Sequence, residues 1–389
     1  MRWSILMSVA LFGAGVAAAP LGLPPVPVPA DNPQSQAKVA LGDALFHDKR
    51  FSSTGTVACS NCHDLAKGLT DSPLVTSEGI NKLTGTRNAP TVANAAFNPV
   101  QFWDGRSPSL EDQSTHPFVN PVEMGLTSHD PIIAIVRADE RYKKQFKDAF
   151  GIEPAAITMT QVSQAIAVFE RTQIYGDSPF DRYWFGHDKT AMTAQQIRGF
   201  DVFLNQGRCV SCHVVEQDNA LFTDGRFHNI GAGINRIQAD VPRFVTAFLE
   251  AKHAGVDVDV KVLSDPHASE LGRFAIDDQF DSVGAFKTPT LRNVELTAPY
   301  FHDGSLKTLR DVVVHYNNGG VTKAGDPVND YLSGGIRPLD LTDAQIDDLV
   351  AFMEALTSPT LKTAHDAAAK AASAGAAATV NAAQTASAD

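Results

Sequence analysis

The five-residue pattern Cys-x-x-Cys-His occurs twice in this chain and constrains it more than any other feature. The two copies, at 59–63 and 209–213, contain all four cysteines of the sequence. In such a pattern each thiol can add to a vinyl group of haem, and the following histidine can bind the iron. A Cys-x-x-Cys redox pair or a divided four-cysteine zinc site are the alternatives, but neither explains a histidine after both pairs. The sequence therefore predicts two covalently bound c-type haems, held by Cys59, Cys62, His63, Cys209, Cys212 and His213.

The N-terminal segment predicts export. Residues 5–19 form an apolar run behind Arg2 and end in small residues. The run is too short to cross a bilayer and has the features of a cleaved signal peptide. Because c-type haem is attached outside the cytoplasm in bacteria, we expect residues 1–19 to be a signal peptide and the protein to be periplasmic. We do not expect an integral membrane protein.

Composition excludes some partners and bounds the number of domains. A chain of 389 residues allows two or three domains. The formal net charge of -12 argues against binding to nucleic acid or to anionic membrane surfaces. It permits docking to a basic partner protein, although an acidic surface is also common in soluble proteins. We expect a monomer or a homodimer.

The order of segments predicts two haem-binding domains between irregular ends. Residues 20–36 are rich in proline and predict an extended arm without its own core. Breaker residues at 176–189 suggest the boundary between domains at 37–180 and 181–358. The tail at 359–389 is nearly all Ala, Ser and Thr, so we expect it to be disordered or loosely helical.

Apolar spacing predicts helices in both domains. Gly42 stands four residues before Phe46, and Gly199 stands four residues before Phe203. Glycine and an aromatic residue one turn apart would let a second helix cross closely while the ring covers a haem edge. This repetition suggests two copies of one unit. The predicted helices are 38–48, 131–150, 160–169, 193–206, 309–316 and 342–356, and we expect 221–281 to form irregular loops.

Polar residues after Trp103 are candidates for peroxide chemistry. Gln113 follows ten residues later, then Pro117, and Glu123 comes in the run Asn-Pro-Val-Glu-Met. A carboxylate and an amide above a five-coordinate haem could take a proton from bound hydrogen peroxide and return it to the departing oxygen. A single Glu is more often a solvated surface charge, so the context decides.

That context is a resemblance to a known family. The runs Phe-Trp-Asp-Gly-Arg at 102–106, Pro-Thr-Leu-Arg-Asn at 289–293 and Ala-Pro-Tyr-Phe-His-Asp-Gly at 298–304 accompany the two haem motifs. Together they resemble the bacterial dihaem cytochrome c peroxidase and MauG superfamily over roughly 37–357. The resemblance implies an all-α fold of two tandem cytochrome c-like domains with long irregular loops.

The resemblance also implies a role for each candidate residue. The haem on His63 would be the peroxidatic one, and the haem on His213 would store and relay electrons. Trp103 would lie between them. The family also holds a calcium ion between its domains, which suits oxygen donors. The remaining implied positions are Gln113, Pro117 and Glu123 for the distal pocket, and Asn88 with the main chain around Thr297 and Pro299 for calcium.

Two departures place the chain nearer to MauG within this resemblance. Peroxidases that need reductive activation carry a blocking histidine where Ile80 stands, so the iron of the first haem should be open. Tyr316 stands where ordinary peroxidases have a methionine ligand to the second haem. Its helical spacing from apolar neighbours turns the phenol to the buried side, and tyrosinate can bind ferric haem. His315 and Met353 are the alternative ligands.

The sequence thus supports two functions of different kinds. In the first, the protein reduces hydrogen peroxide to water with electrons from a small cytochrome c or cupredoxin. In the second, a MauG-like enzyme uses peroxide to oxidise Trp or Tyr side chains of a partner protein. Gly207 stands where MauG has its surface tryptophan, which speaks against the quinone-cofactor role. A plain electron-transfer cytochrome is a third possibility, but Gln113 and Glu123 would then have no purpose.

Overall fold

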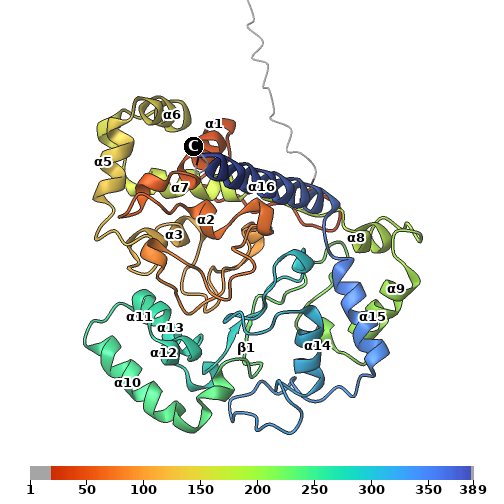
Figure 1. Cartoon of the computed structure of the whole chain (residues 1–389). Helices are drawn as coiled ribbons and strands as arrows, with labels where there is room; N and C mark the ends of the chain where they lie inside the picture. Colours follow the sequence, from red (N-terminus) through yellow and green to blue (C-terminus); the bar gives the residue numbers. More distant parts are fainter. Residues whose placement is uncertain (1–18, 387–389) are drawn as a thin grey trace, which may run out of the picture.

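The computed structural model describes residues 19–386, and the predicted signal peptide lies outside them except for its last residue. The described chain is mostly helical with little sheet (Figure 1). Its named strands, β1 (Phe227–His228) and β2 (Phe286–Lys287), form one antiparallel pair with Phe227 opposite Lys287. Loops and short helical turns therefore make up much of the chain between the longer helices.

The first core gathers the helices around the first haem motif. Its longer helices are α1 (Gln36–Phe46), α5 (Asp130–Ala138), α6 (Glu140–Phe150) and α7 (Met159–Glu170). Helix α1 crosses α7 at Gly42, where a Cβ atom would overlap the carbonyl oxygen of Ala165. Only glycine permits this approach without a shift of the main chain. The expected close crossing is confirmed.

The second core surrounds the second haem motif. It contains α8 (Pro179–Trp184), α9 (Ala194–Leu204), α14 (Leu309–Asn317) and α15 (Asp343–Glu354). Helix α9 crosses α15 at Gly199, where a Cβ would overlap the carbonyl oxygen of Asp348. The same glycine crossing thus recurs in both cores. Thr308 and Thr342 cap α14 and α15, so the helices predicted at 309–316 and 342–356 are confirmed.

A third core corrects the expectation that 221–281 forms irregular loops. The segment folds into four helices with their own apolar interior, drawn in green and teal in Figure 1. Asp257 and Asp265 accept main-chain N–H groups at the starts of two of them, so the segment is divided into pieces too short to give a clear periodic signal. The helices are α10 (Val241–His253), α11 (Val258–Ser264), α12 (Pro266–Glu270) and α13 (Phe274–Asp277).

Three predicted helices differ from the structure, and the first of them, predicted at 38–48, runs from Gln36 to Phe46. The single helix expected at 131–150 is broken at Asp139, whose carboxylate accepts the N–H groups of Arg141 and Tyr142 and starts α6. A residue that ends one helix can cap the next, and periodicity alone does not reveal the break. Helix α7 is capped by Thr158 rather than by Thr160, so it begins earlier than predicted.

Parts of the proline-rich arm and of the start of the tail contact the cores. In the proline-rich arm, the carbonyl oxygen of Gly22 accepts hydrogen bonds from Arg292 at 2.6 Å and from the N–H of Ala220 at 3.0 Å. The tail contains helix α16 (Pro359–Ala386), and its Leu361 is fully buried in the first core. Among the described residues, no helix combines the length and apolar character needed to cross a membrane.

Candidate functional site

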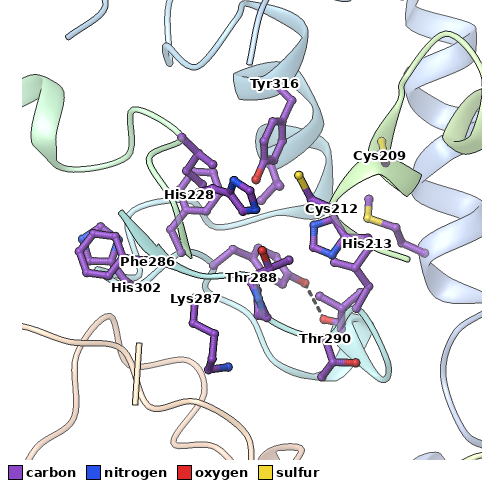
Figure 2. Close-up of a pocket in the computed structure, with 18 of the residues that line it drawn as sticks. Cys209, Cys212, His213, His228, Phe286, Lys287, Thr288, Thr290, His302 and Tyr316 are labelled. Atoms are coloured by element: carbon purple, nitrogen blue, oxygen red, sulfur yellow. Dashed lines mark hydrogen bonds between the residues drawn. The ribbon is translucent and has the colours of Figure 1, made fainter. Parts of the chain in front are cut away.

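The second haem motif faces a cavity of about 280 Å³ (Figure 2). Cys209, Cys212 and His213 lie in its wall, and none of the four cysteines forms a disulfide. His213 Nδ1 donates a 2.8 Å hydrogen bond to the carbonyl oxygen of Phe222. The proton on Nδ1 leaves the lone pair of Nε2 available for a metal. These residues therefore fit a covalently attached haem.

The first motif opens into a smaller cavity, of about 100 Å³, with the same donor arrangement. Cys62 and His63 lie in its wall. His63 Nδ1 donates to the carbonyl oxygen of Leu69 at 3.2 Å, so Nε2 is again free to bind iron. Burial lowers the pKa of both histidines, which favours the neutral ring that metal binding requires. At both motifs, therefore, the histidine can bind a haem iron through Nε2.

The structure brings the three candidate distal residues into the wall of this smaller cavity. Gln113 ends helix α3 (Leu110–Gln113), Pro117 lies in α4 (His116–Val119), and Glu123 follows α4 in a turn. Burial raises the pKa of Glu123 to about 7, and the negative charge of Asp259 adds to the shift. A carboxyl group with that pKa can both accept and return a proton near neutral pH.

Ile80 does not enter the smaller cavity. Its side chain belongs to the first core, and its N–H donates to the carbonyl oxygen of Glu123 at 2.8 Å. Gly79 lies so close to this turn that a Cβ would overlap the carbonyl oxygens of Val122 and Glu123. The segment where a blocking histidine would align thus supports the main chain of Glu123.

Trp103 lies in the walls of both cavities. Its indole Nε1 donates to the carbonyl oxygen of Asn88 at 2.9 Å, and its carbonyl oxygen accepts the N–H of Lys287 at 2.8 Å. Asn88 and the two other residues proposed to bind calcium, Thr297 and Pro299, all line the larger cavity.

Tyr316 and Met353 both line the larger cavity, whereas His315 does not. The phenol of Tyr316 lies on the same side of the cavity as Cys212 and His228 in Figure 2. Burial raises the pKa of Tyr316, so an ionised phenol there would need a positive charge such as a metal ion beside it. His315 Nε2 donates instead to the carbonyl oxygen of Ile230 at 2.8 Å.

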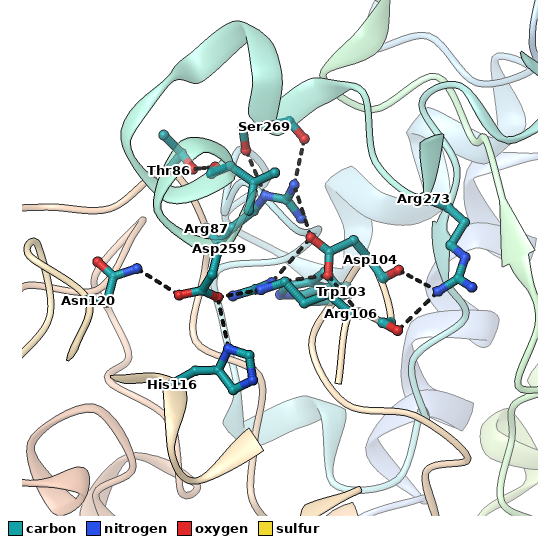
Figure 3. Close-up of polar contacts among 12 residues, drawn as sticks. Thr86, Arg87, Trp103, Asp104, Arg106, His116, Asn120, Asp259, Ser269 and Arg273 are labelled. Carbon is teal, nitrogen blue, oxygen red and sulfur yellow. Dashed lines mark hydrogen bonds and ion pairs between the residues drawn. The ribbon is translucent and has the colours of Figure 1, made fainter. Parts of the chain in front are cut away.

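An ion-pair network that the sequence did not reveal supports the distal loop (Figure 3). Asp259 of α11 accepts from Arg106 at 2.6 Å and from Asn120, three residues before Glu123, at 3.0 Å. His116 approaches the same carboxylate at 3.5 Å. These contacts hold the pKa of Asp259 well below its usual range. Asp259 lies in the segment expected to be irregular, so no local signal marked it.

Two further residues of the smaller cavity were not predicted. Leu263 of α11 closes part of its wall, so the third core contributes directly to the site. Glu170, the last residue of α7, also lines it, and burial raises its pKa to about 8. A glutamate at the end of an apolar helix gives no sequence signal that separates it from a surface charge.

Comparisons with known proteins agree with this geometry. Residues 36–189 match the family model for di-haem cytochrome c peroxidase. The cytochrome-c peroxidase IdrP1 of Denitromonas iodatirespirans is 36% identical over 345 residues, covering 87% of this chain and 86% of that protein. The methylamine utilization protein MauG of Methylorubrum extorquens is 35% identical over 331 residues, covering 85% and 81%.

A solved structure of a related protein has a similar fold. A MauG-like protein associated with microbial copper homeostasis superposes with a TM-score of 0.71 at 33% identity, covering 88% of this chain and 95% of that chain. Family membership implies two haem c cofactors, for which the two motifs and cavities provide the attachment sites. The chain belongs to the di-haem cytochrome c peroxidase family, which also includes MauG.

Proposed function

We propose that the protein is a periplasmic peroxidase that reduces hydrogen peroxide to water with electrons from a small cytochrome c or cupredoxin. The observation that carries the proposal is the shared cavity of His63, Gln113, Pro117 and Glu123. The family supports peroxide-dependent dihaem chemistry, and the donor protein and the direction of electron flow are part of the proposal.

The distal residues would manage the protons of the reaction. When bound, the haems supply an iron that binds peroxide and a route for the two electrons. Glu123 would accept a proton from one oxygen of the peroxide and return it to the other oxygen, which leaves as water. The Gln113 amide orients the peroxide by hydrogen bonding, and the rigid ring of Pro117 limits the space around it. Two protons and two electrons in all convert one peroxide into two waters.

The larger cavity would take part in electron transfer. We propose that Tyr316 would be a second protein ligand of the haem attached at Cys209 and Cys212, because it lines the same cavity as His213 whereas His315 donates to Ile230. An anionic oxygen donor stabilises the ferric state. Trp103, in the wall of both cavities, would lie on the electron path between them. We further propose that a calcium ion binds at Asn88, Thr297 and Pro299, which provide oxygen donors.

A MauG-like oxidase that modifies Trp or Tyr side chains of a partner protein is the second candidate. The observations in its favour are Ile80 at the position of the blocking histidine and Tyr316 in the second cavity. Gly207 still speaks against the quinone-cofactor role, because no aromatic side chain is present there.

One experiment separates the candidates. The purified dihaem protein is mixed with hydrogen peroxide, with and without reduced cytochrome c or reduced cupredoxin. Steady oxidation of the donor at two electrons for each peroxide supports the peroxidase. If peroxide is consumed and a partner protein is modified, while cytochrome c and cupredoxin both stay reduced, the result supports the oxidase. No consumption of peroxide under either condition would reject both.

A further inference from the structure

Within residues 19–386, Lys287 is a buried cation without a counter-charge. It lies in β2, with 8% of its surface exposed, and it is one of the residues that line the larger cavity. In Figure 2 its side chain extends away from His228 and Tyr316. Burial alone lowers the pKa of Lys287 to about 8, and no charged neighbour contributes to the shift. Buried charges in proteins are normally paired, so an anionic partner for this ammonium is expected.

The rest of the wall of the larger cavity also has more positive than negative side chains. Among residues 19–386, it contains Arg208, Lys287, Arg292 and Arg337 but no aspartate or glutamate. This is unexpected in a chain whose formal net charge is -12. Arg292 is neutralised by Asp181 at 2.8 Å, behind the wall. Arg337 is exposed to water and Arg208 is partly exposed. Lys287 is therefore the buried cation of this wall that lacks an internal carboxylate.

The smaller cavity provides a contrast. Its wall holds Glu123 and Glu170 together with Arg87 and Arg106, so acids and bases are both present. An occupant of the smaller cavity meets charges of both signs, whereas an occupant of the larger cavity meets only positive ones. The larger cavity is thus suited to a molecule that carries carboxylates, and haem carries two propionates.

We propose that Lys287 binds a propionate carboxylate of the haem attached at Cys209 and Cys212, and that this ion pair raises the reduction potential of that haem. A positive charge at this position disfavours the ferric state, which carries one more unit of positive charge than the ferrous state. The inference rests on haem attachment at the second motif. It does not depend on whether the reaction at the first is peroxide reduction.

Lys287 would also connect this haem to Trp103. The N–H of Lys287 donates to the carbonyl oxygen of Trp103, so the residue that binds the propionate is hydrogen-bonded to the residue shared by both cavities. Its strand partner Phe227 also lies near Gly105, where a Cβ would overlap the Phe227 ring. A movement of the propionate would therefore act on the segment between the cavities.

The test compares the midpoint potentials of both haems in the intact dihaem protein and in Lys287→Met. Methionine keeps the length and apolar stem of lysine but removes its charge. We expect the ratio of reduced to oxidised haem at His213, at a fixed applied potential, to fall about tenfold, which equals about 59 mV for one electron. Lys287→Arg should restore the original potential. Arg337→Met removes an exposed charge from the same wall and should change the ratio much less, because water screens it.

The remaining outcomes would overturn the assignment. An unchanged potential in Lys287→Met, with two haems still bound, means that no propionate pairs with this ammonium. A shift confined to the haem at His63 places the partner carboxylate on the other haem. If added phosphate or chloride changes the wild-type potential as much as the mutation does, the partner is a small anion. None of these outcomes bears on peroxide turnover, which is measured separately in the same samples.

Discussion

The indole N–H of Trp103 donates a 2.9 Å hydrogen bond to the carbonyl oxygen of Asn88. This bond joins the residue that lines both cavities to the residue proposed to bind calcium. The orientation of the indole and the position of the Asn88 main chain therefore depend on each other. A calcium ion bound at Asn88 would hold the aromatic ring between the cavities.

Trp103→Phe tests this relationship. Phenylalanine keeps an aromatic ring but cannot donate to Asn88, which should cost about 1 kcal/mol of unfolding free energy. We expect slower electron transfer between the haems and unchanged binding of peroxide at the first. Rapid mixing of the half-reduced protein with peroxide measures both rates. Equal transfer rates in the variant and the wild type would remove Trp103 from the electron path.

Removal of calcium should produce a related effect. If the ion binds at Asn88, Thr297 and Pro299, a chelator should slow electron transfer between the haems, and added calcium should restore it. Asn88→Ala should be insensitive to the chelator. Spectra of both haems before and after chelation provide the measurement. Persistence of the wild-type rate after complete removal of the ion would contradict a role for this site.

Glu123→Gln should lower peroxide turnover by about 10²–10⁴-fold, the usual contribution of a positioned acid–base group. Glutamine keeps the size of the side chain but can neither accept nor release the proton. Glu170→Gln is the matched control, because Glu170 is a second carboxyl group in the same cavity. Its turnover should fall much less. Equal losses in the two variants would show that the cavity needs its charge rather than one particular acid.

The pH dependence should report on the same carboxyl group. Glu123 must be ionised to accept a proton, and its pKa is raised from 4.5 to about 7. We therefore expect kcat/KM to rise as the pH increases through about 7 and this rise to be absent in Glu123→Gln. A profile with the same midpoint in the variant would assign the titration to another group.

The raised pKa also predicts how stability varies with pH. Between pH 4.5 and about 7 the folded protein binds the Glu123 proton more tightly than the unfolded chain does. The contribution of Glu123 to unfolding free energy therefore falls as the pH rises across that window. Glutamine does not titrate, so the unfolding free energy of Glu123→Gln does not fall for this reason. Its stability relative to the wild type should therefore increase with pH. Denaturant unfolding at several pH values checks the sign.

Tyr316→Met should raise the midpoint potential of the haem at His213, because a neutral sulfur ligand stabilises the ferric state less than a tyrosinate does. Met353→Leu and His315→Gln are the controls for the two alternative ligands. Only the variant that removes the true ligand should change the low-spin spectrum of this haem. A response to Met353→Leu alone would assign the ligand to the thioether.

The glycine crossings can be tested through stability. Gly42→Ala and Gly199→Ala place a methyl group against a carbonyl oxygen of the crossing helix, so each should destabilise the fold by about 1–3 kcal/mol. Gly334→Ala is the control, because open space surrounds that position. Thermal unfolding of the dihaem protein measures the difference. Wild-type stability in both crossing variants would mean that the helices can separate without cost.

The parts of the site that the sequence predicted depend on short-range patterns. The haem motifs place two thiols and a ligand within five residues, and the apolar spacing of α14 separates Tyr316 from His315. The glycine crossings were also visible, because glycine weakens a helix and its presence inside a helical pattern usually indicates close packing. All the residues that form each of these patterns lie within one or two helical turns of one another in the sequence.

The features that sequence analysis missed depend on contacts between distant segments. Asp259 binds Arg106 across 153 positions of the chain, and neither residue has a local pattern that indicates the other. The third core is built from helices of at most 13 residues separated by capping aspartates, so its periodicity is interrupted. Lys287 belongs to a two-residue strand, and only the folded cavity reveals that it lacks a counter-charge among the described residues.

The hydrogen bond from Arg292 to the carbonyl oxygen of Gly22 has a practical consequence. The guanidinium is almost fully enclosed, and its remaining hydrogen bonds are to Asp181 and to the carbonyl oxygen of Ala220. A C-terminal fragment that starts near residue 181 would lack the Gly22 oxygen and would leave a donor of Arg292 without an acceptor. The two haem units therefore cannot be separated by cutting the chain between them without the loss of a hydrogen bond that the second unit receives from the arm.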